Sequence, residues 1–349
     1  MNEENRLVQS KRRVDSNTVL LFITVVLFVL MYAAGCAIYD AKGFSHVQTF
    51  LNLLITNAGL ICVACGMTCV MLTAGIDISV GSLIAMDCMI LAYGMSIKGY
   101  PAVPLMIFVI IVGIVFGFVQ GFLVGYLEIQ PFIVTMAGLF FARGMTAVIC
   151  TDQLSITEKS NPTFYAWANT KIYLPAFLGY ANNRGKVQVP FIRPTVIIAL
   201  AVVIIIFFVL KYTKFGRTLY AVGGNATSAT MMGLNVKRTK LMAYVLSSFL
   251  CSIGGICYAL NTMSGSVQQA TGFEMDAIAS SVIGGTLLTG GVGNVFGSLF
   301  GVLITGTIHT LVTTNGKLLS SWANIATAAL LCFFIVLQSI FAYLKNRNK

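Results

Sequence analysis

The chain has 349 residues, of which 57% are hydrophobic and only 22 basic and 11 acidic, whereas charged residues make up roughly a quarter of an ordinary soluble domain. This composition excludes a soluble globular protein. It predicts an all-α, polytopic transmembrane bundle, because each spanning helix needs about 20 apolar residues. The net charge of +11 does not indicate nucleic-acid binding, because the basic residues fall in short connectors, where cytoplasmic retention and contact with anionic membrane lipid account for them.

The apolar segments predict ten spans within a transmembrane domain of residues 18–343. Residues 1–17 carry four Lys and Arg before the first span and predict a cytoplasmic amino-terminal segment. An even number of spans then places both termini, including the tail 344–349, in the cytoplasm. The expected spans are 18–39, 50–74, 79–97, 101–127, 131–150, 194–213, 241–262, 275–290, 295–314 and 320–343.

Two connectors are long. The extracytoplasmic loop 151–193 contains Ser160-Asn161-Pro162, which predicts a helix start, and Asn182-Asn183-Arg184-Gly185, which predicts a turn between short extended pieces. We expect this loop to form an ordered cap. The cytoplasmic loop 211–240 carries basic residues only, since no acidic residue occurs between Glu158 and Glu274.

An internal repeat lies at an offset of 216 residues, where residues 71–83 match residues 287–299 at six of 13 positions. Glycine-interrupted segments in corresponding halves are typical of a translocation route, because a broken helix in a membrane requires protein or a water-filled cavity around its freed backbone. The alternative is a pair of tight interhelical turns. The relative direction of the two repeats stays open at this stage.

The sequence offers little for catalysis. It has no Gly-x-x-x-x-Gly-Lys-Ser/Thr phosphate loop, so we do not expect this chain to hydrolyse ATP. His309 stands alone on an apolar helix, in a packed or pore-facing role. Cys62, Cys65 and Cys69 share a helical face without histidine or carboxylate neighbours, which favours packing over metal binding. We therefore predict no catalytic residue, metal or cofactor in this chain.

Polar residues on and between the spans are candidates for the translocation pathway of a neutral, hydroxyl-rich solute. Asp77 follows Gly75 in the first break and precedes Ser79, so we favour a helix-capping role for it over direct contact with the solute. Gln120 fits either the pathway or an interhelical hydrogen bond. The candidate pathway residues are Asn57, Gly75, Asp77, Ser79, Gly81, Gln120, Thr135, Gly291 and Asn294.

The cytoplasmic loop contains a short helix over residues 226–232, which Asn225 begins and Gly233 ends. Such a short helix is unstable alone and needs a surface, so we expect it to dock into a groove on a partner protein. The alternative is a helix lying on the lipid surface. We expect Gly223 and Gly224 to adopt backbone conformations closed to other residues, and Ala229 and Met232 to enter the groove.

Four ordered segments make the chain resemble the permease subunits of ribose- and galactose-type ABC importers. They are residues 75–82, 131–138, 216–225 and the run from 274 through 286 to 290–293. The sequence departs from the family pattern after Asn225, at Ala226 and at Ser228-Ala229-Thr230. The residues that the resemblance and the docking argument assign to ATPase coupling are Gly216, Arg217, Ala221, Gly223, Gly224, Asn225, Ala229, Met232 and Gly233.

The resemblance implies a multi-pass permease in a bacterial plasma (inner) membrane. It implies a second permease subunit, identical or paralogous, a cytoplasmic ATP-binding subunit, and an extracytoplasmic binding protein that delivers a monosaccharide for import. Two other classes are weighed against it: a secondary carrier for a small polar solute, which needs no ATPase, and a membrane enzyme, which needs a catalytic cluster that the sequence lacks. The sequence does not identify the sugar.

Overall fold

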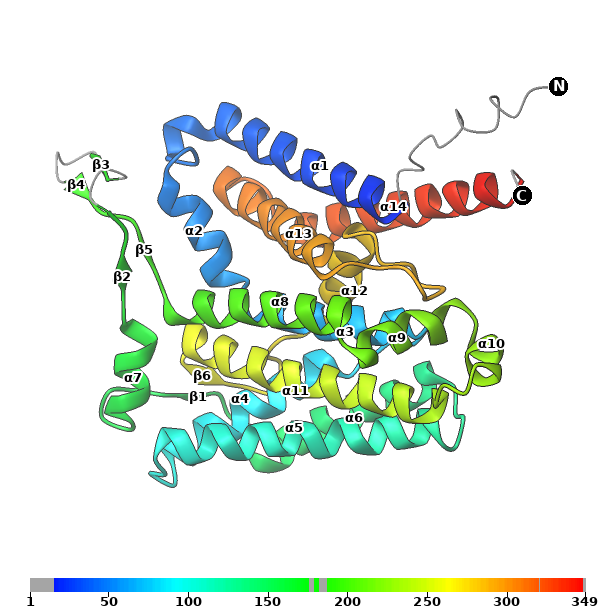
Figure 1. The fold of residues 1–349 in the computed structure, drawn as a ribbon. Coiled ribbons are helices and arrows are strands. Elements are labelled where there is room, and N and C mark those ends of the chain that lie inside the picture. Colours follow the sequence, from blue (N-terminus) through cyan, green and yellow to red (C-terminus); the bar gives the residue numbers. More distant parts are fainter. Residues whose placement is uncertain (1–15, 176–178, 182–186, 320, 348–349) are drawn as a thin grey trace.

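The computed structural model describes residues 16–175, 179–181, 187–319 and 321–347, and it is predominantly helical, as the composition predicts (Figure 1). The elements are α1 (Ser16–Tyr39), η2 (Asp40–Lys42), α2 (Val47–Thr56), α3 (Ala58–Leu72), α4 (Val80–Ser96), α5 (Ala102–Gly125), α6 (Pro131–Ile149), β1 (Leu154–Ser155), α7 (Pro162–Asn169), β2 (Ile172–Tyr173), β3 (Tyr180–Ala181), β4 (Val187–Gln188), β5 (Phe191–Ile192), α8 (Pro194–Tyr212), α9 (Lys214–Gly224), α10 (Ala226–Met231), α11 (Val236–Thr262), β6 (Ser264–Gly265), α12 (Phe273–Ile283), α13 (Val295–Asn315) and α14 (Ser321–Arg347).

Among the described residues, seven helices are long and apolar enough to cross a membrane, and the bent pair α2 and α3 makes an eighth. Ten spans are therefore not confirmed. The expected segment 275–290 contains only α12, whose 11 residues reach about 16 Å, half of the hydrocarbon core. The rest of that segment is apolar loop, which hydropathy alone does not distinguish from helix. The α4 helix, with 17 residues, is also below the length of a full span.

The α11 helix runs through the bundle between α3 and α5 (Figure 1). Glycines four residues apart on α5 allow its backbone to approach α11 closely: a Cβ at Gly121 would lie 2.6 Å from the carbonyl oxygen of Leu241, and one at Gly125 2.6 Å from that of Lys237. Small residues at this spacing are the usual basis of close helix packing in membranes. They allow α5 and α11 to pack closely along their length.

The two ends of the bundle differ. One end carries α7 and the antiparallel strand pairs β1–β6, β2–β5 and β3–β4, and we call it the α7 end. The other carries α9 and α10, with the start of α1 and the end of α14 (Figure 1), and we call it the α10 end. The predicted helix start is confirmed, because the Asn161 side chain accepts a hydrogen bond from the Phe164 N–H at 2.9 Å. The predicted turn Asn182–Gly185 and residues 1–15 lie outside the described residues.

The two repeats run in the same direction. The α3 helix of the first repeat and α12 of the second both end at loops that touch, because the Gly291 N–H donates a hydrogen bond of 3.0 Å to the Leu72 carbonyl oxygen. From these loops α4 and α13 both lead away toward the α7 end. The repeat is therefore parallel, which decides the question that the sequence left open.

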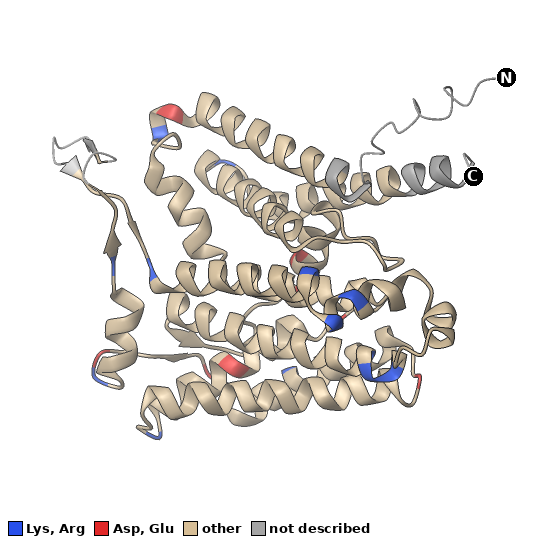
Figure 2. Cartoon of the chain, in the orientation of Figure 1, with Lys and Arg blue, Asp and Glu red and all other residues tan. Residues whose placement is uncertain are grey.

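Charge is sparse along the helices and gathers at connections (Figure 2). Basic residues cluster around α9 and the first turns of α11, at the α10 end of the bundle. Acidic residues lie at a few separate places. The distribution agrees with the wholly basic loop that the sequence shows between residues 211 and 240.

Candidate functional site

The first break separates α3 from α4 inside the bundle. After Leu72 the backbone turns back through Ala74, which has a left-handed φ of 59°, and the Gly75 N–H donates to the Val70 carbonyl oxygen at 3.2 Å. A Cβ at Gly75 would lie 2.7 Å from the hydroxyl oxygen of Tyr244. A side chain at this position would require the Tyr244 hydroxyl to move, so Gly75 allows the broken chain to pass close to α11.

Asp77 is fully buried in this break and organises the residue that precedes α4. Its Oδ1 accepts from the Ser79 backbone N–H at 3.1 Å and from the Ser79 hydroxyl at 2.6 Å, while Oδ2 accepts from the Ser247 hydroxyl at 3.1 Å. The N–H that Asp77 binds belongs to Ser79, the N-cap residue of α4, so Asp77 holds the turn before the helix and bonds no N–H within α4, unlike the capping role expected for it. A carboxylate at this end of a helix also meets the positive end of its dipole.

Gln120 and Thr135 join the same cluster from neighbouring helices. The Gln120 amide donates to Ser79 Oγ at 3.0 Å, and the Thr135 hydroxyl donates to the Pro131 carbonyl at 2.9 Å and lies 3.3 Å from the Ile76 carbonyl. The structure thus brings together five predicted pathway residues, Gly75, Asp77, Ser79, Gln120 and Thr135. Asp77, Ser79 and Gln120 hydrogen-bond one another, and Thr135 bonds the backbone beside them, so these side chains hold the break in place inside the protein.

Three other predicted pathway residues lie apart from that cluster. Asn57 occupies the bend between α2 and α3, where its amide donates to the Leu53 carbonyl at 2.8 Å. Asn294 caps α13, its Oδ1 accepting from the Phe296 N–H at 3.0 Å. Gly81 lies at the start of α4, and a Cβ there would lie 2.8 Å from the Ala270 carbonyl oxygen and overlap the Glu274 carboxylate. Gly81 therefore permits contact between α4 and the chain entering α12.

The second break, residues 284–294, contains the remaining predicted pathway residue, Gly291. Gly285, Gly290 and Gly291 have left-handed φ values of 90°, 83° and 73°, which favour glycine. Gly290 packs against the first break, because a Cβ there would lie 2.8 Å from the Ala74 backbone nitrogen. The loops of the two breaks therefore form one contact region at the α10 end of α3 and α12.

The α9 helix reaches this contact region. A Cβ at Gly223 would overlap the Leu72 carbonyl oxygen and lie 2.5 Å from the Gly291 nitrogen, and the Tyr220 hydroxyl donates to the Gly293 carbonyl at 2.9 Å. Gly223 and Gly224 have no left-handed φ, so the expectation that they serve through unusual backbone conformations is wrong. Gly223 instead permits close approach, whereas a Cβ at Gly224 would meet no atom within 4 Å.

The α10 helix begins and ends as predicted. The Asn225 side chain accepts from the Ser228 N–H at 2.8 Å, and Gly233 closes the helix with a left-handed φ of 77°. Ala229 is fully buried in the chain, so its expected entry into a partner groove is wrong. Met231 and Met232, exposed by 82% and 68%, are the side chains that α10 presents outward.

The other residues assigned to coupling lie on α9. Thr213 begins this helix, its hydroxyl accepting from the Gly216 N–H at 3.1 Å. Gly216 is buried against the end of α8, Arg217 is exposed and Ala221 is half-buried. These three residues therefore differ in exposure: Gly216 packs within the chain, whereas the Arg217 side chain is accessible at the surface.

A groove of about 780 Å³ separates α10 and the start of α11 from the connection between α5 and α6. Thr227, Thr230 and Met231 line it from α10, and an ion pair of 3.2 Å joins Lys237 to Glu128 across it. Both charged side chains are more than half exposed, so this pair contributes little to stability. The groove and the two methionines form the outward surface at this end of the bundle.

Ionisable residues that the sequence analysis left out of the pathway lie near the start of α12. The Arg143 side chain of α6 donates to the Val267 and Gln269 carbonyls at 2.6 and 2.8 Å and interacts electrostatically with Glu274. Asp276 interacts in the same way with His309 of α13. All four are only partly buried, and ionisable groups within or beside membrane-spanning helices are candidates for functional sites. The sequence did offer one signal for this group of ionisable residues, namely the charged Arg143 within an apolar segment.

Comparison with known proteins places this architecture in a family. The family model described as "Branched-chain amino acid transport system / permease component" matches residues 49–337. The chain belongs to this permease family. Its relatives include the "Inner membrane ABC transporter permease protein YjfF" of Escherichia coli, which is 39% identical over 91% of both chains. No solved structure matches the chain.

Two further relatives are named for the sugars they import. The "Fructose import permease protein FruG" of Bifidobacterium longum is 35% identical over 93% of this chain and 92% of its own. The "Ribose import permease protein RbsC" of Haemophilus influenzae is 32% identical over 84% of this chain and 85% of its own. These relatives support an ABC permease over the secondary carrier. With the apolar helices, they also support an inner-membrane location for this family member.

Proposed function

We propose that this permease forms the membrane pathway of an ATP-driven importer that receives a monosaccharide from an extracytoplasmic binding protein. The single observation that carries the mechanism is the contact of α9 with both breaks, through Gly223 and Tyr220. The names of the ribose and fructose import relatives support a sugar as the solute. In this proposal the α10 end faces the cytoplasm and both termini lie there.

ATP hydrolysis takes place in a partner subunit that docks on α10. The exposed Met231 and Met232 supply flexible apolar contacts, and the adjoining groove with Lys237 and Glu128 supplies a polar rim. Movement of the docked subunit displaces α10 and α9 together, because Asn225 both ends α9 and caps α10. The displacement then reaches the loops 73–79 and 284–294 through the α9 contacts.

The sugar passes along the partly buried face near the start of α12, between this chain and a second permease subunit, identical or paralogous. Arg143, Glu274, Asp276 and His309 lie on that face. Charged groups inside a membrane protein require water or polar partners. Sugar hydroxyls can be such partners, because they both donate and accept hydrogen bonds. The hydrogen-bonded side chains of Asp77, Ser79 and Gln120 hold the first break in place behind this face. The α7 end, with its strand pairs, receives the binding protein.

The test is uptake of labelled ribose and fructose into proteoliposomes that contain the permease, its co-purified ATPase subunit and the binding protein. We expect the labelled sugar to accumulate only when ATP is present on the cytoplasmic side of the importer. We expect no accumulation when the binding protein is omitted. Accumulation driven by a proton gradient, in vesicles without the ATPase, would contradict the proposal. Mild-detergent purification from the native cell, followed by identification of the co-purifying chains, identifies the partners and the second permease subunit.

A further inference from the structure

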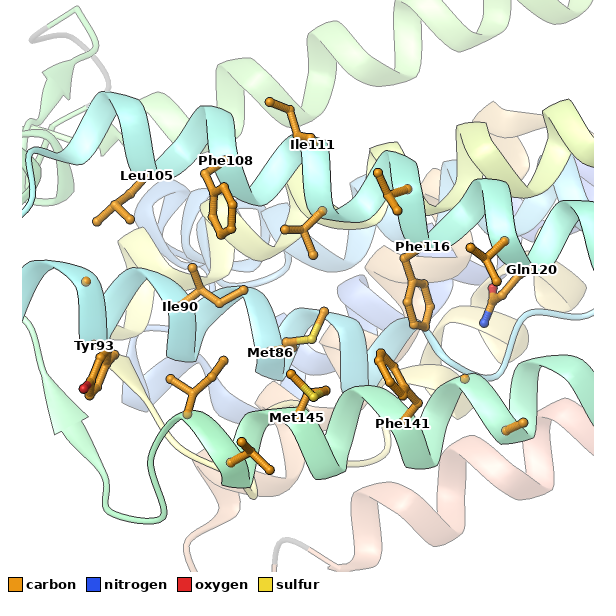
Figure 3. Close-up of a pocket in the computed structure, with 18 of the residues that line it drawn as sticks. Met86, Ile90, Tyr93, Leu105, Phe108, Ile111, Phe116, Gln120, Phe141 and Met145 are labelled. Atoms are coloured by element: carbon orange, nitrogen blue, oxygen red, sulfur yellow. The ribbon is translucent and has the colours of Figure 1, made fainter.

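A long apolar groove of about 1150 Å³ lies between α5 and α6, with α4 behind it (Figure 3). Phe116 and Phe141 face one another across it, stacked with 6.5 Å between ring centroids. Hydrocarbon side chains line nearly its whole length, and Phe141 remains 60% exposed. Gln120 supplies a polar group at the end nearer the α10 end of the bundle, and its amide already donates to Ser79.

The α6 helix has two opposite faces of different chemistry. Val134, Phe141 and Met145 line the groove, and their spacing places them on one face. Arg143 lies two and a half turns from Val134 and so points about 180° away, where it contacts the segment before α12. The groove is therefore on the side of α6 that faces away from the charged surface assigned above to sugar passage.

The mouth of the groove at the α7 end carries a cation and two tyrosines. Lys98 is exposed, and its Nζ lies 5.9 Å above the centroid of the Tyr93 ring. Among the described residues it makes no ion pair with a carboxylate. Tyr100 lines the same mouth, and tyrosines favour the level of the lipid headgroups. A positive group at a headgroup level above a hydrocarbon groove matches the two chemical parts of a phospholipid.

We propose that this groove binds a phospholipid from the leaflet on the α7 side, with its phosphate at Lys98 and an acyl chain between α5 and α6. The acyl chain fills the space between Phe108, Val115 and Phe141, which no side chain of the described protein occupies. An acyl chain gains little free energy by moving from the bilayer into this groove, because both surroundings are hydrocarbon. Selective retention therefore depends on the phosphate contact and on the shape of the groove.

The experiment titrates delipidated, detergent-purified permease with phosphatidylglycerol and measures bound lipid by native mass spectrometry. Lys98→Gln removes the cation and should weaken binding about fivefold, the usual effect of one basic residue at a membrane surface. Val115→Trp places a larger side chain in the groove and should remove the tightly bound lipid. The matched controls should bind as the parent does. They are Phe118→Trp, exposed on α5 outside this groove, and Lys171→Gln, which removes a cation that lies over the Phe191 ring and is not among the residues lining this groove.

Equal lipid binding by all four variants would overturn the proposal. So would a change of oligomeric state in the Val115→Trp protein with lipid binding unchanged, because a second copy of the chain would then occupy the groove. Size-exclusion chromatography with light scattering measures that state. Phosphatidylcholine, which carries the same phosphate without net charge, serves as the second probe. Lys98→Gln should reduce the preference for phosphatidylglycerol over phosphatidylcholine, and an unchanged preference would remove Lys98 from the site.

Discussion

The backbone N–H of Gly291 donates a hydrogen bond of 3.0 Å to the carbonyl oxygen of Leu72. This bond joins two loops that correspond in the internal repeat, and it lies directly beside α9, where a Cβ at Gly223 would overlap the same Leu72 oxygen. A displacement of α9 therefore acts on the ends of α3 and α12 together. In the proposed function, an ATPase docked on α10 therefore acts on both halves of the permease through this one contact.

The first prediction concerns Gly223. Gly223→Val introduces side-chain atoms where Leu72 and Gly291 now approach, so the loops must move apart. We expect at least a tenfold loss of ATP-driven uptake, together with a destabilisation of about 1–3 kcal/mol, typical of overpacking. Uptake into proteoliposomes and the thermal unfolding midpoint measure these effects, and ATPase co-purification should persist because α10 keeps its exposed surface.

Gly224→Ala is the control for that variant, because a Cβ at Gly224 meets no atom within 4 Å. It should transport and unfold as the parent does. Normal transport by Gly223→Val would show that the close approach of α9 to the breaks has no part in coupling.

Sequence reasoning predicted the features that depend on local chemistry. Asn225, Asn161 and Gly233 have the helix-end roles that their residue types favour, because such contacts join residues close in the chain. The four sequence segments that resemble ABC importer permeases also identified the permease family to which the chain belongs. The membrane helices were also predicted well wherever the apolar segment was continuous helix, as for α5 and α8.

Contacts between residues distant in the chain could not be predicted from the sequence. Ala229 and Met232 are both apolar, and only the fold determines that Ala229 faces inward while Met232 faces outward. Gly223 permits the close approach of α9 to Leu72. Leu72 is distant in the chain, so the sequence alone could not predict this role. The segment 275–290 was predicted as one span because hydropathy measures composition, and α12 ends within it at Ile283.

The second prediction concerns the cap of α10. Asn225→Ala removes the acceptor of the Ser228 N–H and should destabilise this short helix by about 1 kcal/mol. Because α10 cannot persist alone, the ATPase should co-purify in reduced amount and uptake should fall. Asn225→Asp restores an acceptor and should recover both measurements. Full ATPase retention by Asn225→Ala would show that an ordered α10 is unnecessary for docking.

The third prediction separates the charge of Asp77 from its hydrogen bonds. Asp77→Asn retains an oxygen for the Ser79 N–H and should keep most uptake, whereas Asp77→Leu leaves the buried Ser79 and Ser247 groups unpaired, at a cost of about 1–3 kcal/mol each. The measurements are uptake rate and unfolding midpoint for each variant. Equal loss of uptake in both, with Asp77→Asn folded as the parent, would point to an essential charge.

The fourth prediction concerns Arg143, which holds the chain entering α12 through the Val267 and Gln269 carbonyls. Arg143→Met removes both hydrogen bonds to a charged donor, each of which contributes about 1.5–3 kcal/mol. We expect uptake to fall at least tenfold while ATPase co-purification stays unchanged, because Arg143 lies outside α10 and the groove beside it. Arg143→Lys keeps the charge and one of the two contacts, so it should transport at an intermediate rate. If Arg143→Met transports normally, the segment before α12 is held by Gln269 and its neighbours alone, and Arg143 has no role in the pathway.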